Sequence, residues 1–258
     1  MRTIFGRRRG SPVLTVGLLV GVGALGLGGA AWKYPGAVRS LLQRARGVEP
    51  RTVEQVLDSC GQKAELRFAP ACRAAGIDWP PARVRLLAFK RERRLEVWVA
   101  GPEGPFVPAA AYPVLGASGG PGPKRRDGDG QVPEGMYGLS ELNPNSGFHL
   151  AVRVNYPNQE DFSHAVVAPA QMGSDVMVHG GDVSTGCLAI GDPAIEDVFC
   201  LLAHVPVSGR DIWIAPVDFR REPGWMPGKE DPWVLAMYRR LAERLGREHA
   251  VKDATARR

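Results

Sequence analysis

The sequence predicts a mainly β domain with helices, an α+β fold, preceded by an N-terminal transmembrane helix and a small helical segment. Three observations support this prediction. The 258 residues include 32 glycines and 22 prolines, which favour short strands and turns over long helical bundles. From about Val84, apolar and polar residues alternate with the period of two that is typical of strands. Between Arg9 and Lys33 no residue is charged.

We interpret residues 10–33 as a transmembrane signal anchor. The 20 residues from Val13 to Trp32 are mostly Val, Leu, Ala and Gly, and a helix of that length spans a bilayer core of about 30 Å. The basic tail 1–9 would stay in the cytoplasm by the positive-inside rule, which places the rest of the chain on the extracytoplasmic side of the membrane. The alternative is secretion after signal cleavage, since Gly29, Ala30 and Ala31 form a small-residue cleavage site.

The distribution of charge argues against a nucleic-acid partner. The formal net charge is +6, but residues 1–46 contain eight basic and no acidic residues, and residues 239–258 contain seven basic and three acidic ones. The body between these ends is acidic. A DNA-binding core would instead concentrate its basic residues on the folded domain.

Residues 34–81 are expected to form a juxtamembrane connector followed, from Arg51, by short helical runs and turns. Cys60 and Cys72 lie twelve positions apart in this segment. They could close a disulfide in an oxidising compartment, or remain two unpaired thiols. Cys200 lies in an apolar helical run and is expected to be a small buried side chain.

The main domain is expected over residues 84–218. Alternating patterns predict its strands at residues 85–89, 94–99, 106–115, 149–156, 174–178 and 211–216. Between the third and fourth strands lies a long glycine-rich loop, residues 116–135, and loops of that length are usually functional or disordered.

Two helices complete the predicted fold. Asp192 is expected to be the N-cap of a helix that begins with Pro193 and ends near His204. Residues 219–258 are expected to form a C-terminal amphipathic helix, from Pro232 to about Ala250, and a basic tail.

The residues most suggestive of chemistry are His179-Gly180-Gly181-Asp182-Val183-Ser184-Thr185-Gly186-Cys187. A thiol becomes a useful nucleophile as its thiolate, which requires a nearby base or cation. His179 can supply that base if the small residues between it and Cys187 fold back. Gly186 permits a tight turn in which successive N–H groups converge, as stabilisation of a tetrahedral oxyanion requires. These residues therefore suggest acyl transfer by a Cys–His pair.

At these positions the sequence resembles a known family. HGGDVSTGC is similar to the HG…SxGC signature of the L,D-transpeptidase (YkuD-type) catalytic domain, and its short loop between His and Cys resembles the YafK-like branch. Upstream, GPKRRDGDGQVPEGMYGL and LNPNSGFHLAVRVNYPNQED resemble the GPK…GD…PEG…Y and NPNS…YPN…D patterns of that branch. The resemblance covers about Val84 to Pro216 and implies a β-sandwich catalytic domain that acts on peptidoglycan stem peptides.

The resemblance also implies roles for individual residues. Cys187 would be the nucleophile and His179 the general base and later acid, with the Gly180 carbonyl orienting the imidazole. The N–H groups of Thr185, Gly186 and Cys187 would stabilise the oxyanion, and Ser184 would shape the loop or contact substrate. Thr185 and Ala189 stand where many transpeptidases carry His and Arg, which leaves the acceptor open.

Four further residues are candidates for substrate contacts. Lys124 and Arg125 could bind a substrate carboxylate or be solvated charges of the loop. Tyr156 and Asn158 could line the pocket or simply form a turn. No cofactor and no metal are expected, because His149, His164, His204 and His249 lack a paired-ligand spacing. A zinc peptidase that uses His179 and Asp182 is the remaining metal-dependent alternative.

The sequence thus predicts a cysteine-dependent murein L,D-transpeptidase that remodels the cell wall through an acyl-enzyme. Its partners would be stem peptides, the membrane and an amine or wall-linked protein as acceptor. One alternative is a hydrolase with the same Cys/His site, which would cleave murein or murein–protein links. An alternative of another class is a catalytically inactive cell-wall-binding domain.

Overall fold

The computed structural model describes residues 49–255, with side chains up to residue 248. The expected anchor at 10–33, the basic tail 1–9 and most of the connector lie outside the described residues. Residues from Pro50 onward form one compact unit. Within the described range, none of the helices combines the length and apolar character needed to cross a membrane.

Eight strands form one continuous sheet in the order β3-β2-β1-β8-β4-β5-β6-β7. Their bounds are β1 Arg83–Phe89, β2 Arg94–Ala100, β3 Val107–Pro113, β4 Gly135–Ser146, β5 His149–Val154, β6 Met177–His179, β7 Leu188–Ala189 and β8 Arg210–Ala215. Parallel pairing occurs between β1 and β8 and between β6 and β7. The six strands predicted from alternation are present, although β6 begins only at Met177, and β4 and β7 are additions.

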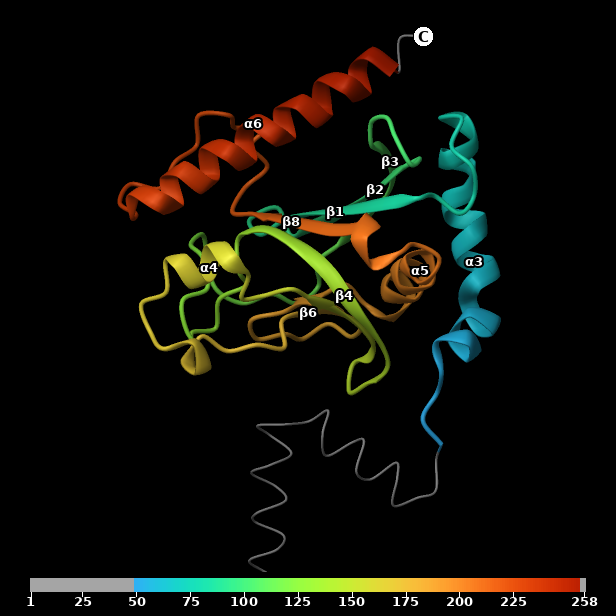
Figure 1. Cartoon of the computed structure of the whole chain (residues 1–258), viewed down its shortest axis with the longest axis horizontal. Coiled ribbons are helices and arrows are strands. Elements are labelled where there is room, and N and C mark those ends of the chain that lie inside the picture. The colour runs from blue at the N-terminus through green and yellow to red at the C-terminus, as the bar shows by residue number, and fades with distance from the viewer. Residues whose placement is uncertain (1–48, 256–258) are drawn as a thin grey trace, which may run out of the picture. The chain divides into compact units, whose positions relative to one another are not determined.

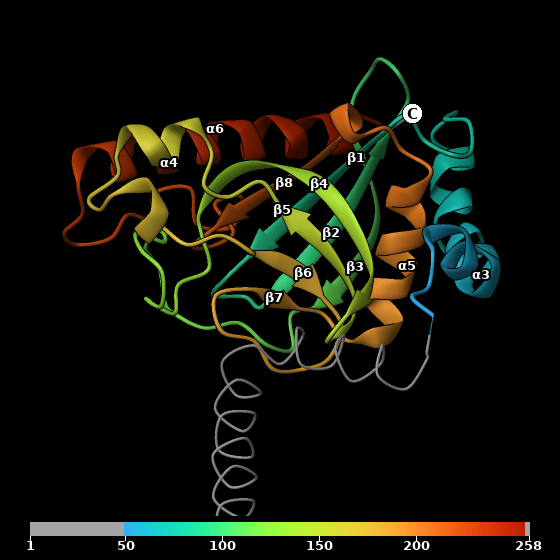
Figure 2. The same cartoon turned by 60° about the horizontal axis from the view of Figure 1, so that its bottom comes forward.

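Strand β4 joins the two halves of the sheet. Its first residues, from Gly135 to Gly138, pair with β8, and the residues from Leu139 onward pair with β5, with two irregularities in the register. Such bulges bend a strand and increase its twist, and the sheet is visibly curled (Figure 2). The structure is therefore a mixed α+β fold with a single curled sheet, where the sequence led us to expect the two separate sheets of a β-sandwich.

Alternate residues of the central strands face two different cores. Leu86 of β1 and Ile212 of β8 point into the larger core, which the two halves of the sheet share with two helices. Leu87 and Trp213, one position further along each strand, point into the second core, beneath the C-terminal helix. Central strands buried on both faces explain why this part of the sequence is nearly continuously apolar.

The helix α3 (Val53–Ala74) is one uninterrupted helix of 22 residues. The short helical runs and turns expected here are therefore wrong. Thr52 caps the helix in a capping box with Gln55, and Pro70 is accommodated inside it. The apolar face of α3 packs in the larger core, beside α5 (Figure 1).

Helices α5 (Asp192–Ala203) and α6 (Pro232–Thr255) agree with the two helices predicted downstream. One detail is wrong, since the N-cap is Gly191 rather than Asp192. The Asp192 carboxylate instead accepts a hydrogen bond of 2.8 Å from the Gly181 N–H. The remaining short helices are α4 (Gln159–Ser163), η1 (Pro169–Gln171) and η2 (Val207–Gly209).

The long loop at residues 116–135 is ordered by buried charges. The Glu134 carboxylate is 1 % exposed, and it accepts hydrogen bonds from the Gly122 N–H and the Tyr238 hydroxyl of α6. Lys90 Nζ lies 2.9 Å from the same carboxylate. Because these partners come from the loop, the sheet and α6, Glu134 fixes the loop against the rest of the domain.

Candidate active site

His179 and Cys187 lie at the two ends of the connection between the neighbouring strands β6 and β7. His179 is the last residue of β6, and Cys187 immediately precedes β7. The two strands are parallel neighbours, with Val178 opposite Leu188. The chain between them therefore folds back within eight residues, which is why His and Cys can be so close in sequence.

Glycines make this sharp return possible. A Cβ atom on Gly180 would lie 2.5 Å from an Asp192 carboxylate oxygen and 2.6 Å from the Phe148 carbonyl oxygen, so no larger residue fits there without a shift. Gly186 has φ +82°, a conformation that L side chains adopt rarely. The loop thus depends on glycine at both ends.

His179 is fixed as a neutral base. Its Nδ1 lies 2.6 Å from the Gly180 carbonyl oxygen, and since a carbonyl only accepts, Nδ1 carries the proton. The ring is 3 % exposed, packs against Phe148 at 4.6 Å between centroids, and burial lowers its pKa. Nε2 is left without a proton and lies 3.2 Å from Ser184 Oγ, which donates to it. This agrees with the expectation that the Gly180 carbonyl orients the imidazole.

The Cys187 thiol is partly buried, and burial raises its pKa. Its sulfur accepts from the Met177 N–H at 3.4 Å and donates to the Asp175 carbonyl at 3.5 Å. A hydrogen bond with Ser184 and the charge of Lys124 act in the opposite direction and lower the thiol pKa. Because the pKa of His179 is lowered as well, both groups are neutral near pH 7 rather than an ion pair.

Ser184 contacts the imidazole and influences the thiol. Its hydroxyl hydrogen-bonds with Nε2 of His179, and the serine is one of the groups that lower the pKa of the Cys187 thiol. Within residues 49–248, no direct hydrogen bond joins the imidazole to the thiol.

The three expected oxyanion donors differ in availability. The Gly186 N–H donates to Ser118 Oγ at 2.8 Å and is therefore engaged. Of the N–H groups of Thr185 and Cys187, neither donates to another residue in the described part of the chain. Both residues line the cavity at the thiol, so two of the three expected donors are free to bind an oxyanion.

A cavity of about 150 Å³ opens at Cys187. Its lining comes from the glycine-rich loop, the segment that precedes β6 and the turn at Cys187: Lys124, Asp127, Gly128, Gly130, Ser174, Asp175, Val176, Thr185, Gly186 and Cys187. Lys124 is 8 % exposed, and its ammonium donates to Asp129 Oδ1 at 2.9 Å and to the Arg126 carbonyl at 2.8 Å. One N–H of this ammonium remains for a ligand in the cavity.

The other three expected substrate contacts lie outside this cavity. Arg125 pairs with Asp231 at 2.9 Å and lies over the Trp233 ring, so it joins the loop to α6. The Tyr156 hydroxyl donates to the Met172 carbonyl at 3.3 Å. The Asn158 side chain caps α4, in agreement with the turn interpretation.

Sequence reasoning missed Asp175 and Ser118. Asp175 has φ +58°, and its carbonyl accepts from the thiol of Cys187. Ser118 binds the Gly186 N–H and donates to the Gly130 carbonyl. Neither belongs to a motif, because each acts through its position in space. The sequence carried no signal for either, because Asp175 lies within the strand predicted at 174–178 and Ser118 within the long loop at 116–135.

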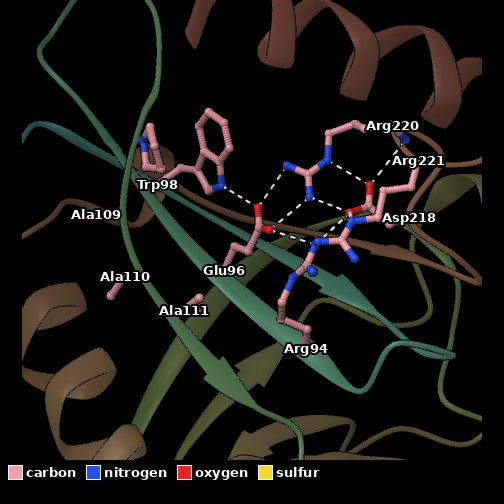
Figure 3. Close-up of a pocket in the computed structure, with 10 residues that line it drawn as sticks. Arg94, Glu96, Trp98, Ala109, Ala110, Ala111, Asp218, Arg220 and Arg221 are labelled. Carbon is pink, nitrogen blue, oxygen red and sulfur yellow. Dashed lines mark hydrogen bonds and ion pairs between the residues drawn. The ribbon is translucent and has the colours of Figure 1, made fainter. Parts of the chain in front are cut away.

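A second, larger cavity contains arginines and carboxylates but is separate from the thiol. It measures about 560 Å³ and lies between β2, β3 and the segment after β8 (Figure 3). Arg220 binds Glu96 at 2.8 Å and Asp218 at 2.7 Å, and Arg94 binds Asp218. Arg221 lies 3.7 Å from Asp218, and Nε of Arg94 is buried without a hydrogen-bond partner among the described residues. Among the residues that the structure describes, no three His, Cys, Asp or Glu side chains lie together in an arrangement that could hold a metal ion.

Comparison with known proteins agrees with the resemblance seen in the motifs. No protein-family model matches the chain. YafK of Escherichia coli K12, whose name provisionally assigns it as an L,D-transpeptidase, is 33% identical over 129 residues, which are 49% of this chain and 50% of YafK. The same values hold for YafK of E. coli O157:H7. The chain thus spans about half the length of the curated relatives it matches.

Solved structures are similar over a comparable share. Bd1075 of Bdellovibrio bacteriovorus is 24% identical with a TM-score of 0.39, over 53% of this chain and 49% of that one. The helical cell shape determining protein Pgp2 of Campylobacter jejuni is 21% identical with a TM-score of 0.41, over 52% and 46%. The sequence match is the stronger relationship, and it shows that about half of this chain is similar to the YafK branch of the L,D-transpeptidases.

Proposed function

We propose that this chain is a cysteine-dependent murein L,D-transpeptidase that acts on peptidoglycan stem peptides. The observation that supports the proposal is that His179 and Cys187 flank the connection between two parallel neighbouring strands, with His179 oriented by the Gly180 carbonyl, in a chain 33% identical to YafK. A buried neutral base, a thiol and free N–H donors are the groups that acyl transfer requires.

In the first half of the reaction, the Cys187 sulfur attacks the carbonyl carbon of the scissile peptide bond. The thiol proton passes through the Ser184 hydroxyl to Nε2 of His179. The oxyanion that forms accepts hydrogen bonds from the N–H groups of Thr185 and Cys187. The C–N bond then breaks, and the leaving amine takes the proton from His179, which leaves a thioester on Cys187.

In the second half an acceptor amine attacks the thioester, and its proton passes to His179. The tetrahedral intermediate collapses, the C–S bond breaks and the proton returns to the sulfur. Attack by water on the same thioester gives hydrolysis instead. The two activities therefore share every residue named above, and only the acceptor distinguishes them.

Lys124 is the residue that we propose to bind the substrate. Its ammonium lines the cavity at Cys187 and keeps its position through Asp129. A stem peptide carries carboxylates, and a buried ammonium with an unused N–H is a suitable partner for one of them. Arg125 is not included, because it pairs with Asp231.

We further propose that residues 10–33 anchor the protein in the bacterial inner membrane with its catalytic domain in the periplasm. The proposal rests on the uncharged run between Arg9 and Lys33 and on the basic residues before it. Secretion after cleavage would export the same domain. Protease protection in spheroplasts distinguishes the orientations, since only a periplasmic domain is digested from outside.

The decisive experiment is product analysis on purified muropeptides, with and without an added acceptor amine. New cross-linked or amine-modified products that require Cys187 indicate transfer. Shortened stems or released wall-linked protein indicate hydrolysis. The Cys187→Ala variant should form neither, and Cys72→Ala, which removes a buried thiol of α3, is the matched control. A folded wild type that binds murein without any product would identify a binding module and contradict the proposal.

A further inference from the structure

Two cysteines outside the active site lie in contact. Cys60 Sγ of α3 is 3.0 Å from Cys200 Sγ of α5, although the two residues are 140 positions apart. Cys60 is 8 % exposed and Cys200 is fully buried. The contact therefore lies inside the interface between the two helices and away from the cavity at Cys187.

The pairing of Cys60 with Cys72 does not fit this structure. Cys60 and Cys72 lie on the same continuous helix, where twelve residues at 1.5 Å rise separate their Cα atoms by about 18 Å. A disulfide requires Cα atoms within about 7 Å, so the Cys60–Cys72 bridge suggested by the sequence is wrong. Cys187 lines the proposed active-site cavity.

We propose that Cys60 and Cys200 form a disulfide that fastens α3 to α5. The reaction is thiol–disulfide exchange with a disulfide donor, which is a thiol–disulfide oxidoreductase in an oxidising compartment or oxidised glutathione in vitro. One thiolate attacks the donor disulfide and releases a donor thiol. The second thiolate then attacks the mixed disulfide, forms the Cys60–Cys200 bond and releases the second donor thiol. Two protons and two electrons leave the protein, and the donor is reduced.

Because both thiols are buried in the folded interface, the exchange must take place before α3 packs against α5. Burial raises the pKa of the Cys200 thiol, so the folded interface contains an unreactive thiol that no donor can reach. The bond must therefore form while α3 is undocked, either during folding or in a transient opening. Once closed, it is shielded by the same packing that excluded the donor.

The disulfide would strengthen the contact between α3 and α5, whose peripheral ion pairs are weak. Lys63 lies 3.5 Å from Glu196, and Arg67 lies 3.6 Å from Asp197, but both cations are half exposed and such pairs contribute little. The first residue of α5 is Asp192, which holds the Gly181 N–H of the His–Cys loop. A fastened α3 thus stabilises the helix that supports the site.

The inference is independent of the proposed function and is tested by thiol counting and peptide mapping. The full chain is purified in detergent, reduced, and incubated with a glutathione redox buffer in urea below the unfolding midpoint, so that α3 can open. After digestion without reductant, we expect a cross-linked peptide that contains Cys60 and Cys200, and two free thiols in the denatured protein. Four free thiols, or a bridge between other cysteines, would overturn the inference.

Thermal unfolding provides a second readout. Reduction of the oxidised wild type should lower Tm on the order of 5–10 °C, because a link across 140 residues restricts the unfolded chain. The same reductant should leave the Tm of Cys60→Ala unchanged, whereas Cys72→Ala should respond as the wild type does. An equal Tm before and after reduction of a mapped disulfide would contradict its stabilising role.

Discussion

Ser184 Oγ lies 3.2 Å from Nε2 of His179, and the same serine lowers the pKa of the Cys187 thiol. We therefore propose that the serine connects the base to the nucleophile during the reaction. Sequence similarity alone assigned it a role in loop shape or substrate contact. Its position adds a role in proton transfer, which has a distinct kinetic consequence.

Replacing Ser184 by Ala should slow acylation of Cys187 by about 10- to 100-fold, since the proton loses its path to the imidazole while base and nucleophile remain. Ser184→Thr keeps the hydroxyl and should retain most of the rate. Single-turnover acylation by a carbapenem, followed by intact mass, measures both variants. Equal rates for Ala and wild type at every pH would exclude the bridging role.

Reactivity of Cys187 should rise towards alkaline pH. Burial raises the pKa of its thiol and lowers the pKa of His179. Near neutral pH the thiol therefore keeps its proton instead of transferring it to the imidazole. The rate of alkylation by iodoacetamide, mapped to Cys187 by peptide mass, should keep increasing above pH 8.5. His179→Ala should leave this profile nearly unchanged. A reactive plateau between pH 5 and 7 that disappears in His179→Ala would reveal a thiolate–imidazolium pair and contradict the neutral site.

Asp161 should make stability depend on pH. Burial raises the pKa of this carboxyl to about 6, above its value of about 3.9 in an unfolded chain. The folded state therefore binds the proton more tightly. This contribution to stability is fully present below about pH 4 and is lost as the pH rises through 6.

Asp161→Asn resembles the protonated form at every pH. As the pH rises from 4 to 7, the free energy of unfolding of the variant should increase relative to that of wild type by on the order of 1–2 kcal/mol, measured by urea unfolding at each pH. Glu65→Gln, at an exposed position of α3, is the control. A constant difference between Asp161→Asn and wild type across this range would refute the linkage.

Glu134 should be essential for the loop that carries Lys124. Its carboxylate is buried with Lys90, Gly122 and Tyr238, so Glu134→Ala leaves a buried ammonium without its partner. Breaking such a pair costs about 3–5 kcal/mol, which urea unfolding would detect. Adding Lys90→Met should recover part of the loss. If the double variant were as unstable as Glu134→Ala, the unpaired charge would not be the cause.

The sequence predicted the features that depend on residues close together in the chain. The alternation in residues 84–99 predicted β1 and β2, and the short spacing between His179 and Cys187 predicted the candidate site, because the two residues flank one connection between parallel neighbouring strands. Strand β4 was missed, since its register shifts against β5 break the period of two. The continuous helix α3 was not predicted, because glycine and proline, here Gly61 and Pro70, usually interrupt helices. Tertiary packing of the apolar face stabilises the helix through both positions.

Contacts between distant segments had no signal in the sequence. The pairing of Cys60 with Cys200 depends on how α3 docks on α5, whereas the closer spacing of Cys60 and Cys72 suggested the wrong bridge. Arg125 was a reasonable candidate for a substrate carboxylate until its pairing with Asp231 of the same domain was visible. Ser118, which engages the Gly186 N–H, is likewise defined only by the fold.

The measurement that tests the central claim most directly is the intact mass of the protein during turnover of a tetrapeptide stem. We expect a transient increase equal to the acyl part of the donor, located on Cys187 by peptide mapping and discharged by an added amine. Cys187→Ala should never gain this mass, and Cys72→Ala should gain it as wild type does. Turnover of the same stem by Cys187→Ala, or an acyl group on another residue, would contradict the account.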